Sequence, residues 1–234
     1  LNGVAVLIKT ATMFILNKIL AVYVGPAGYA AIGQFQNFIQ MVTTFAGSAI
    51  NTAVIKYTAE YHENEHQQIS VWRAAGSLVL IFSFIFSLII LIFQKQLSLY
   101  IFQTTAYQSV FAWFAAFLVL FNLNALFLAI LNGKKEILKL VVANIVGSIL
   151  SLLVTGFLAV QYHLYGALIA LSIYQSLVFF VTLFLCYKAN WFKISYLFGR
   201  IEPQIAKNFA AFALMALVSA ICVPLSQMVI RSYL

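Results

Sequence analysis

Long apolar runs leave this chain few possible folds. The first two runs, 4–24 and 31–55, flank the sequence Gly25-Pro26-Ala27-Gly28. Each reaches the roughly 20 residues that a helix needs to cross a bilayer. In lipid such a run can only be helical, because every backbone donor and acceptor must be satisfied within the segment. The two runs therefore predict membrane-spanning helices.

The same pattern recurs along the whole chain. Composition agrees with a membrane protein: 64% of residues are hydrophobic, only 8% are charged, and the mean hydropathy is +1.02. A soluble domain carries about 25% charged residues. We predict an all-α, polytopic membrane helix bundle with about seven transmembrane helices, at 4–24, 31–55, 74–93, 110–131, 140–160, 166–187 and 209–229.

The basic residues are distributed unevenly between the two sides of these spans. Nine lysines and arginines fall in the segments 56–73, 132–139 and 188–208, whereas the opposite connections hold only Lys95 and Arg231. Basic loops face the cytoplasm, so we predict a cytoplasmic N-terminus. Membrane orientation explains the net charge of +8, and no nucleic-acid partner is expected.

Two lysines, Lys9 and Lys18, lie within the first run. An ammonium at membrane depth is costly unless it faces water or a partner, so each is a candidate functional residue. At about 100° per residue they lie on the two edges of a polar half-cylinder centred on Thr10 and Asn17. The alternative, that a lysine stem snorkels to the lipid headgroups, remains open.

Polar residues also recur at helical spacing in other runs, and we predict a hydrated cavity between these helices. Serine and threonine are more typical of close helix packing. Asparagine and glutamine are more costly to bury, so they are the better cavity candidates. Asn122 and Asn124 lie about 200° apart on one helix and cannot share a face. The cavity candidates are Asn17, Asn37, Gln40, Asn51, Asn124 and Asn144.

No pattern for catalysis or metal binding is convincing. His62-Glu63-Asn64-Glu65-His66 fits the H-E-x-x-H zinc pattern, but it lies in a charged connector, and His163 is on the other side of the membrane. All five glutamates lie in the predicted cytoplasmic segments, and the chain has no aspartate. We predict no catalytic residue, no metal site and no cofactor, so the protein is not expected to be an enzyme.

Several short segments resemble one membrane protein family. They are Asn17 to Val22 followed by Gly25-Pro26-Ala27-Gly28, Lys56-Tyr57, Glu60-Tyr61-His62, Ile194-Ser195-Tyr196-Leu197 and 212–217. In this order they resemble Wzx-type lipid-linked O-antigen and enterobacterial-common-antigen flippases. These are the polysaccharide transporter family of the multidrug/oligosaccharidyl-lipid/polysaccharide exporter superfamily.

The resemblance implies a domain organisation. Proteins of this superfamily typically have twelve helices in two lobes of six. By that likeness, 1–190 is the N-terminal six-helix lobe, 191–208 is a cytoplasmic linker between lobes, and 209–234 is the first helix of a truncated C-terminal lobe. The chain is then expected to be an N-terminal fragment.

The resemblance also implies a function. The family moves an undecaprenyl-pyrophosphate-linked oligosaccharide from the cytoplasmic to the periplasmic leaflet of the bacterial inner membrane. Lys9 and Lys18 would meet the pyrophosphate, and the six amide residues would bind the sugars. Expected partners are this lipid-linked substrate, the bilayer, and a polysaccharide polymerase with its chain-length regulator.

Three other functions remain open. A multidrug or cation exporter of the same superfamily would need carboxylates within the membrane, and no span contains one. A membrane-embedded polymerase or ligase would need catalytic residues near a periplasmic loop. Nothing in the sequence excludes a non-catalytic assembly subunit.

Overall fold

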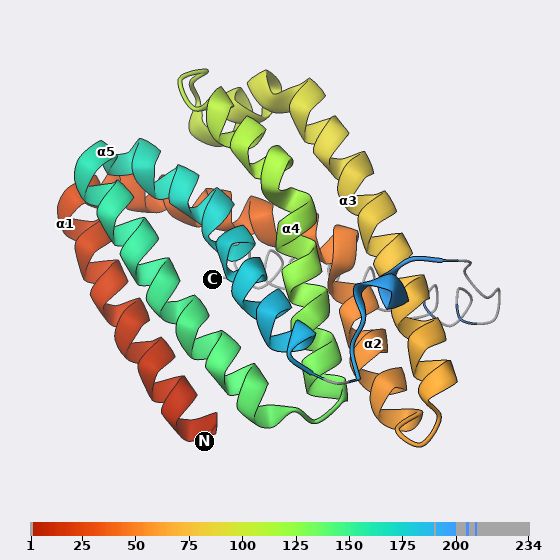
Figure 1. The fold of residues 1–234 in the computed structure, drawn as a ribbon. Helices are drawn as coiled ribbons and strands as arrows, with labels where there is room; N and C mark the ends of the chain where they lie inside the picture. The colour runs from red at the N-terminus through yellow and green to blue at the C-terminus, as the bar shows by residue number, and fades with distance from the viewer. Residues whose placement is uncertain (1, 190, 200–204, 206–208, 210–234) are drawn as a thin grey trace, which may run out of the picture.

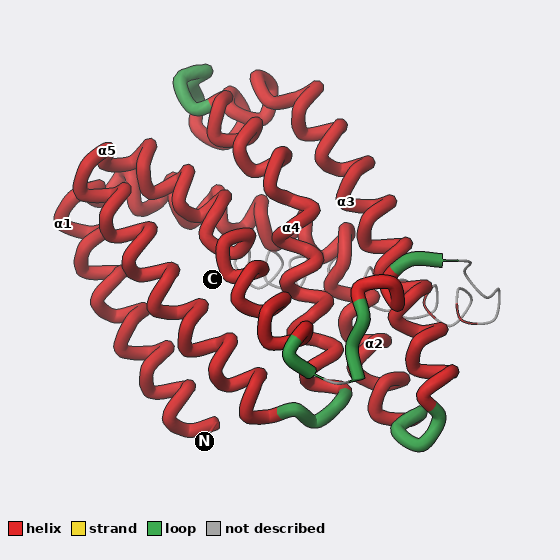
Figure 2. Tube along the Cα trace, in the orientation of Figure 1, coloured by secondary structure: helices red, strands yellow, loops and turns green. Residues whose placement is uncertain are grey.

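The described part of the chain is helical throughout. The computed structural model describes residues 2–189, 191–199, 205 and 209, and these residues contain no strand (Figure 2). The helices are α1 (Asn2–Thr43), α2 (Ala49–Glu60), α3 (Glu65–Phe102), α4 (Gln108–Gly133) and α5 (Ile137–Tyr187), with a π-helical turn at Thr44–Ser48 and a 3-10 turn, η2, at Ile194–Leu197. The all-α prediction is confirmed.

Two of the helices contain a sharp bend. α1 has 42 residues and α5 has 51, which at about 1.5 Å per residue is roughly twice the 30 Å thickness of a hydrocarbon core. Gly25 in α1 and His163 in α5 have non-helical backbone, and the chain turns back at each bend (Figure 1). We call the segments 2–24 and 26–43 the first and second arms of α1, and 137–162 and 164–187 the first and second arms of α5.

Each bend has a local cause. Gly25 has φ 75° and ψ 173°, a region that is open essentially to glycine alone. Beyond His163, a Cβ added at Gly166 would overlap the carbonyl oxygen of Leu158, so glycine lets the two arms of α5 approach closely. His163 Nδ1 lies 3.1 Å from the carbonyl oxygen of Tyr23, so an Nδ1–H donates a hydrogen bond from one bend to the other.

The predicted count of about seven spans is not confirmed. Four helices of the described chain are long and apolar enough to cross a membrane, and the two bends divide them into six segments. These six correspond to the first six predicted runs. The predicted seventh span, 209–229, falls almost wholly outside the described residues.

The second span is longer than the sequence indicates. The Thr43 hydroxyl donates to the Ile39 carbonyl at 2.8 Å, and the Thr44 hydroxyl donates to the Gln40 carbonyl at 2.7 Å. Such bonds compete with the backbone ladder and bend helices. Here Thr43 is the last residue of α1 and Thr44 is the first residue of the π-helical turn. Through this turn α1 continues directly into α2.

The connector 56–73, expected to be a loop, is mostly helical. Only residues 61–64 interrupt the helices, and the Asn64 side chain caps α3 by accepting from the Gln67 N–H at 3.2 Å. The cause is tertiary: Trp72 Nε1 donates to Thr58 Oγ1 at 2.9 Å, and Gln68 Nε2 donates to the Thr58 carbonyl at 2.7 Å. These contacts bury polar residues that the sequence assigns to a loop.

Turns of the chain gather at the two ends of the bundle. The N-terminus and the turns 61–64 and 134–136 lie at one end, and the turn 103–107 lies at the other (Figures 1 and 2). We call the first the basic end, because its turns and flanking residues include Lys134, Lys135, Lys139 and Lys188. That the basic end faces the cytoplasm stays a prediction.

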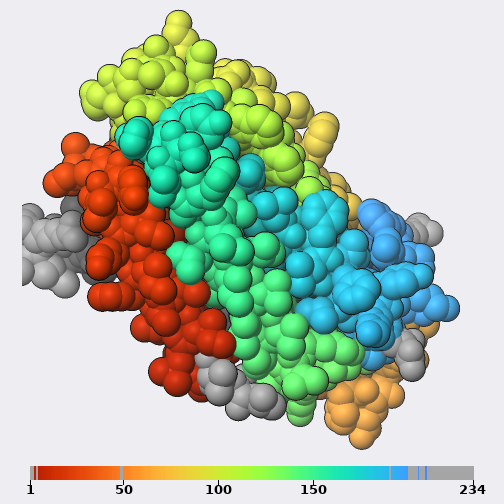
Figure 3. Space-filling view, turned by 60° about the vertical axis from the view of Figure 1, so that its left-hand side comes forward, coloured from red at the N-terminus to blue at the C-terminus, as the bar shows by residue number. Residues whose placement is uncertain are grey.

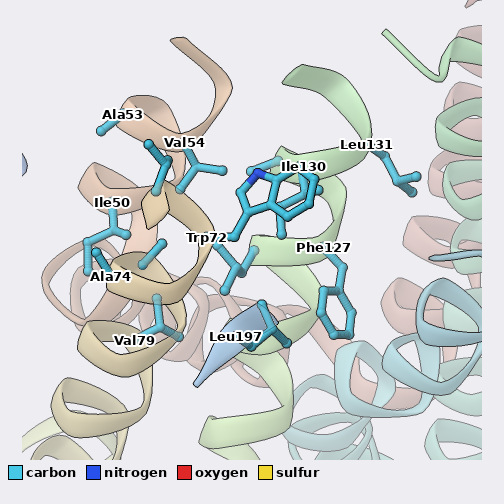
Figure 4. Packing of buried hydrophobic residues seen from close by; sticks show 14 of the residues in the cluster. Ile50, Ala53, Val54, Trp72, Ala74, Val79, Phe127, Ile130, Leu131 and Leu197 are labelled. Atoms are coloured by element: carbon cyan, nitrogen blue, oxygen red, sulfur yellow. The ribbon is translucent and has the colours of Figure 1, made fainter. Parts of the chain in front are cut away.

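The core near the basic end joins α2, α3, α4, α5 and η2. Figure 4 shows Trp72 and Val79 of α3 packed with Val54 of α2, Phe127 of α4 and Leu197 of η2. A second core, rich in phenylalanine, joins α1, α3, α4 and α5. On another face the first arms of α1 and α5 lie side by side along their length (Figure 3), which leaves the space between α1, α5 and α4 for a cavity.

Candidate functional site

A cavity of about 490 Å³ lies between α1, α4 and α5. Ligand sites commonly have volumes of about 300–1,000 Å³. It is nearer the basic end, because its lining includes Ala5, close to the N-terminus, and Leu128 and Ala143, close to either side of the turn 134–136. The polar lining residues are Lys9 and Thr12 from the first arm of α1, Gln36 from the second arm, Asn124 from α4, and Asn144, Ser148, Ser151, Tyr174 and Gln175 from α5.

Among the described residues, the lining carries one positive charge and no carboxylate. Lys9 is exposed and forms no ion pair among the described residues. Around it lie amides and hydroxyls, two of which are occupied by their own helices: Thr12 Oγ1 lies 2.9 Å from the Ile8 carbonyl, and Ser148 Oγ donates to the Asn144 carbonyl at 2.8 Å. An ammonium beside uncharged hydrogen-bonding groups suits a ligand that has both an anionic and a hydroxyl-rich part.

Asn124 differs from the other polar residues of the lining because it is fully buried. Its Oδ1 accepts a hydrogen bond from the Thr182 hydroxyl at 2.7 Å. Its Nδ2 is buried without a hydrogen-bond partner in the described structure. Asn122, two residues earlier, faces another neighbour and donates to Ser83 Oγ at 2.9 Å.

Three of the predicted site residues line the cavity: Lys9, Asn124 and Asn144. The cavity faces the side of the first α1 arm centred on Lys9, about 100° from the line of Thr10 and Asn17. Lys18 is nine residues further on and about 180° away, and it is exposed outside the cavity. The other predicted residues outside this lining are Asn17, Asn37, Gln40 and Asn51.

Several lining residues were not among the predicted site residues. Ser148, Ser151 and Gln175 belong to polar stripes that also fit helix packing. Tyr174 lies deep in a span, away from the interfaces where tyrosines gather, and that position was a usable signal. Gln36 carries no signal that separates it from Asn37, which is exposed and does not line the cavity.

A cluster of charged and aromatic residues lies outside the cavity, at the basic end. Glu136 Oε1 accepts from Trp191 Nε1 at 2.9 Å and lies 3.2 Å from Lys139 Nζ. The hydrogen bond from Trp191, followed by the contact and charge of Lys139, lowers the pKa of Glu136 from its ordinary value. Lys134 Nζ lies 5.6 Å from the ring centre of Trp72 and 5.3 Å from that of Trp191. These contacts attach the segment after α5 to the bundle.

The pair His62 and His66 shows no metal-binding arrangement. His62 lies in the turn 61–64 and its Nε2 is 3.5 Å from Glu63 Oε1, with both side chains largely exposed. Within the part of the chain that the structure describes, no group of three or more His, Cys, Asp or Glu side chains is positioned to hold a metal ion.

Solved structures of MATE proteins have a similar fold. A crystal structure of a MATE mutant superposes with a TM-score of 0.71 at 17% identity, covering 98% of this chain and 54% of that one. MATE in a bent conformation gives 0.68 at 17% identity, over 96% of this chain and 53% of that one. At these identities the likeness shows the fold alone, a bundle of long helices.

Comparison of sequences gives the family. The lipid III flippases of Escherichia coli (strain K12) and Shigella flexneri are each 28% identical over 236 residues, covering 100% of this chain and 56% of the relative. The chain thus spans about half the length of these relatives, which are named as flippases. Residues 2–233 match the family model described as polysaccharide biosynthesis protein, and the resemblance noted from short segments is confirmed. The chain is an integral membrane protein that belongs to the polysaccharide biosynthesis protein family.

Proposed function

We propose that this chain forms the substrate-binding lobe of a flippase. The substrate is an oligosaccharide linked to undecaprenyl pyrophosphate, such as an O-antigen unit. It moves from the cytoplasmic to the periplasmic leaflet of the bacterial inner membrane. A polysaccharide polymerase and its chain-length regulator would act on the product.

The observation that carries this proposal is the composition of the cavity wall. A pyrophosphate is anionic, and the wall supplies the ammonium of Lys9 with no described carboxylate beside it. A sugar needs hydrogen-bond partners, and the wall supplies Gln36, Asn124, Asn144 and Gln175. The polyprenyl tail can remain in lipid along an apolar helix face. One cavity then holds groups for both polar parts of the substrate.

The position of the cavity supports the direction of transport. It lies in the half of the bundle next to the basic end, which the distribution of lysine and arginine assigns to the cytoplasm. A substrate assembled at the cytoplasmic leaflet would enter there. The similar lipid III flippases are named for moving a lipid, and they are nearly twice as long as the chain.

Lys18 is proposed as a separate anion contact. It is exposed on the first arm of α1, on the face opposite Lys9, so both lysines cannot hold the same group in this cavity. Its role as a headgroup ligand stays a prediction, together with the sugar-binding roles of Asn17, Asn37, Gln40 and Asn51.

Reconstituted transport tests the proposal. The purified protein is placed in liposomes that contain a fluorescent undecaprenyl-pyrophosphate-linked oligosaccharide, and a membrane-impermeant quencher reports which leaflet holds the label. We expect label to cross the bilayer faster than in protein-free liposomes. A rate no higher than in those liposomes, together with measurable export of an organic cation by the same preparation, would overturn the proposal in favour of a drug exporter.

A further inference from the structure

Five buried side-chain atoms of the described residues have no hydrogen-bond partner, and of these only the Asn124 amide nitrogen belongs to a residue that lines the cavity. Leaving a buried donor without a partner is unfavourable, because the group loses its hydrogen bonds to water. The Thr182 hydroxyl lies 2.7 Å from Asn124 Oδ1 and 3.1 Å from the Val178 carbonyl oxygen, so its one proton is shared between two acceptors while Thr182 orients the Oδ1 side of the amide. With Oδ1 beside Thr182, the two N–H bonds of Nδ2 have no acceptor among the described residues, and Asn124 belongs to the wall of the cavity.

The surroundings of this amide are suited to a neutral group. Leu128 lies one helical turn beyond Asn124 on α4, and Tyr174 and Val178 face the cavity from the second arm of α5. None of these residues is charged. Lys9, the only charged residue among the described residues of the lining, belongs to a different helix. An anion held by Lys9 and an uncharged acceptor held by Asn124 would therefore occupy different walls of one cavity.

We propose that Asn124 reads the saccharide part of the ligand, with Thr182 as the residue that positions its amide. The acceptor is an uncharged sugar oxygen, either a hydroxyl or an acetamido carbonyl, close to the pyrophosphate. This inference rests on the proposed function. It adds that the cavity distinguishes a glycosylated lipid from the same lipid without sugar, and it assigns that distinction to one side chain.

The test compares two ligands that differ only in the sugar. Equilibrium binding of undecaprenyl pyrophosphate and of undecaprenyl pyrophosphate linked to N-acetylglucosamine is measured with the purified protein in lipid nanodiscs. We expect wild type to bind the glycosylated lipid more tightly. Asn124→Leu should weaken that binding about 3- to 10-fold, the range for loss of one neutral hydrogen bond, and should leave the affinity for the bare lipid unchanged.

Matched variants separate recognition from packing. Thr182→Val keeps the side-chain shape and should produce a smaller loss for the glycosylated lipid only. Asn122→Leu removes the neighbouring buried amide, which is paired with Ser83 outside the cavity, and should not alter the ratio of the two affinities. Asn124→Ala is measured beside Asn124→Leu, so that a folding defect in the larger substitution does not decide the result.

The outcomes distinguish this inference from the proposed function. Equal weakening of both lipids in the Asn124 variants would show a packing role and overturn the inference while leaving the flippase proposal intact. Equal affinity of wild type for both lipids would overturn it as well, since no sugar would be read. If wild type binds neither lipid, the proposed function itself fails.

Discussion

At the scale of single residues, the cavity depends on a few positions where another residue type could not adopt the same backbone conformation or make the same contact. Gly25 is one of them, because its φ of 75° and ψ of 173° reverse the chain between the two arms of α1. That reversal brings Lys9 of the first arm and Gln36 of the second arm to the same cavity. A change at this one residue should therefore act on the site at a distance.

We predict that Gly25→Ala destabilises the protein by about 1–3 kcal/mol, the typical cost of forcing a residue with a Cβ into this backbone region. The measurement is thermal unfolding in detergent. Gly33→Ala is the matched control: a Cβ there meets nothing within 4 Å, so the better helix propensity of alanine should be neutral or stabilising by up to about 1 kcal/mol. Equal melting temperatures for the two variants would contradict this account of the bend.

At the scale of elements, Glu136 links the turn between α4 and α5 to the segment that follows α5. It accepts a hydrogen bond from Trp191 and pairs with Lys139. In the same segment, Leu197 packs against α3, and a Cβ added at Gly76 would overlap the Leu197 carbonyl oxygen. The segment 191–198, expected from the family resemblance to begin a linker, is packed on the bundle.

This link should weaken in acid. The folded state lowers the pKa of Glu136, so its contribution to stability is present at neutral pH and is lost as the pH falls below the ordinary value of 4.5. Glu136→Gln should lower the melting temperature at pH 7, and the difference from wild type should shrink as the pH is lowered through 4.5, with tryptophan emission as the readout. A difference that stays constant down to pH 3.5 would contradict the assignment.

The six described spans were predictable because a 20-residue apolar run has one structural solution in lipid. The extension of α3 back to Glu65 was not, because it depends on Thr58 meeting Gln68 and Trp72 from another helix. The cavity was predictable only in part. Lys9 carries a charge in a span and is a strong signal, whereas the choice of Gln36 over Asn37 depends on how the arms of α1 rotate after the bend at Gly25.

At the scale of the whole molecule, the helices form a bundle whose basic turns gather at one end (Figure 1). The likeness to MATE structures extends over nearly all of the chain but about half of theirs. Under the proposed function, the orientation of this bundle in the membrane decides from which leaflet the substrate enters the cavity, and this orientation can be tested separately from transport.

We predict that the basic end faces the cytoplasm. Single cysteines replace the exposed residues Glu63, Lys135 and Phe198 in a background without Cys186 and Cys222, and intact cells with a permeabilised outer membrane receive an impermeant thiol reagent. These three should remain unlabelled, whereas Thr105→Cys, in the turn at the opposite end, should react. The reverse pattern would place the cavity in the periplasmic half.

The central claim is that Lys9 meets the pyrophosphate of a lipid-linked oligosaccharide, and charge substitution tests it most directly. Lys9→Arg, Lys9→Gln and Lys9→Glu are measured in the liposome translocation assay at equal protein density. Lys95→Gln, which removes an exposed lysine of α3 away from the cavity, is the control.

Loss of one charge-assisted contact costs about 1.5–3 kcal/mol, or roughly a tenfold to hundredfold fall in affinity. Lys9→Gln should therefore transport poorly at low substrate concentration, Lys9→Arg should keep much of the activity, and Lys9→Glu should have none. Full transport by Lys9→Gln, equal to that of Lys95→Gln, would mean that Lys9 only snorkels to the headgroups and would contradict the account.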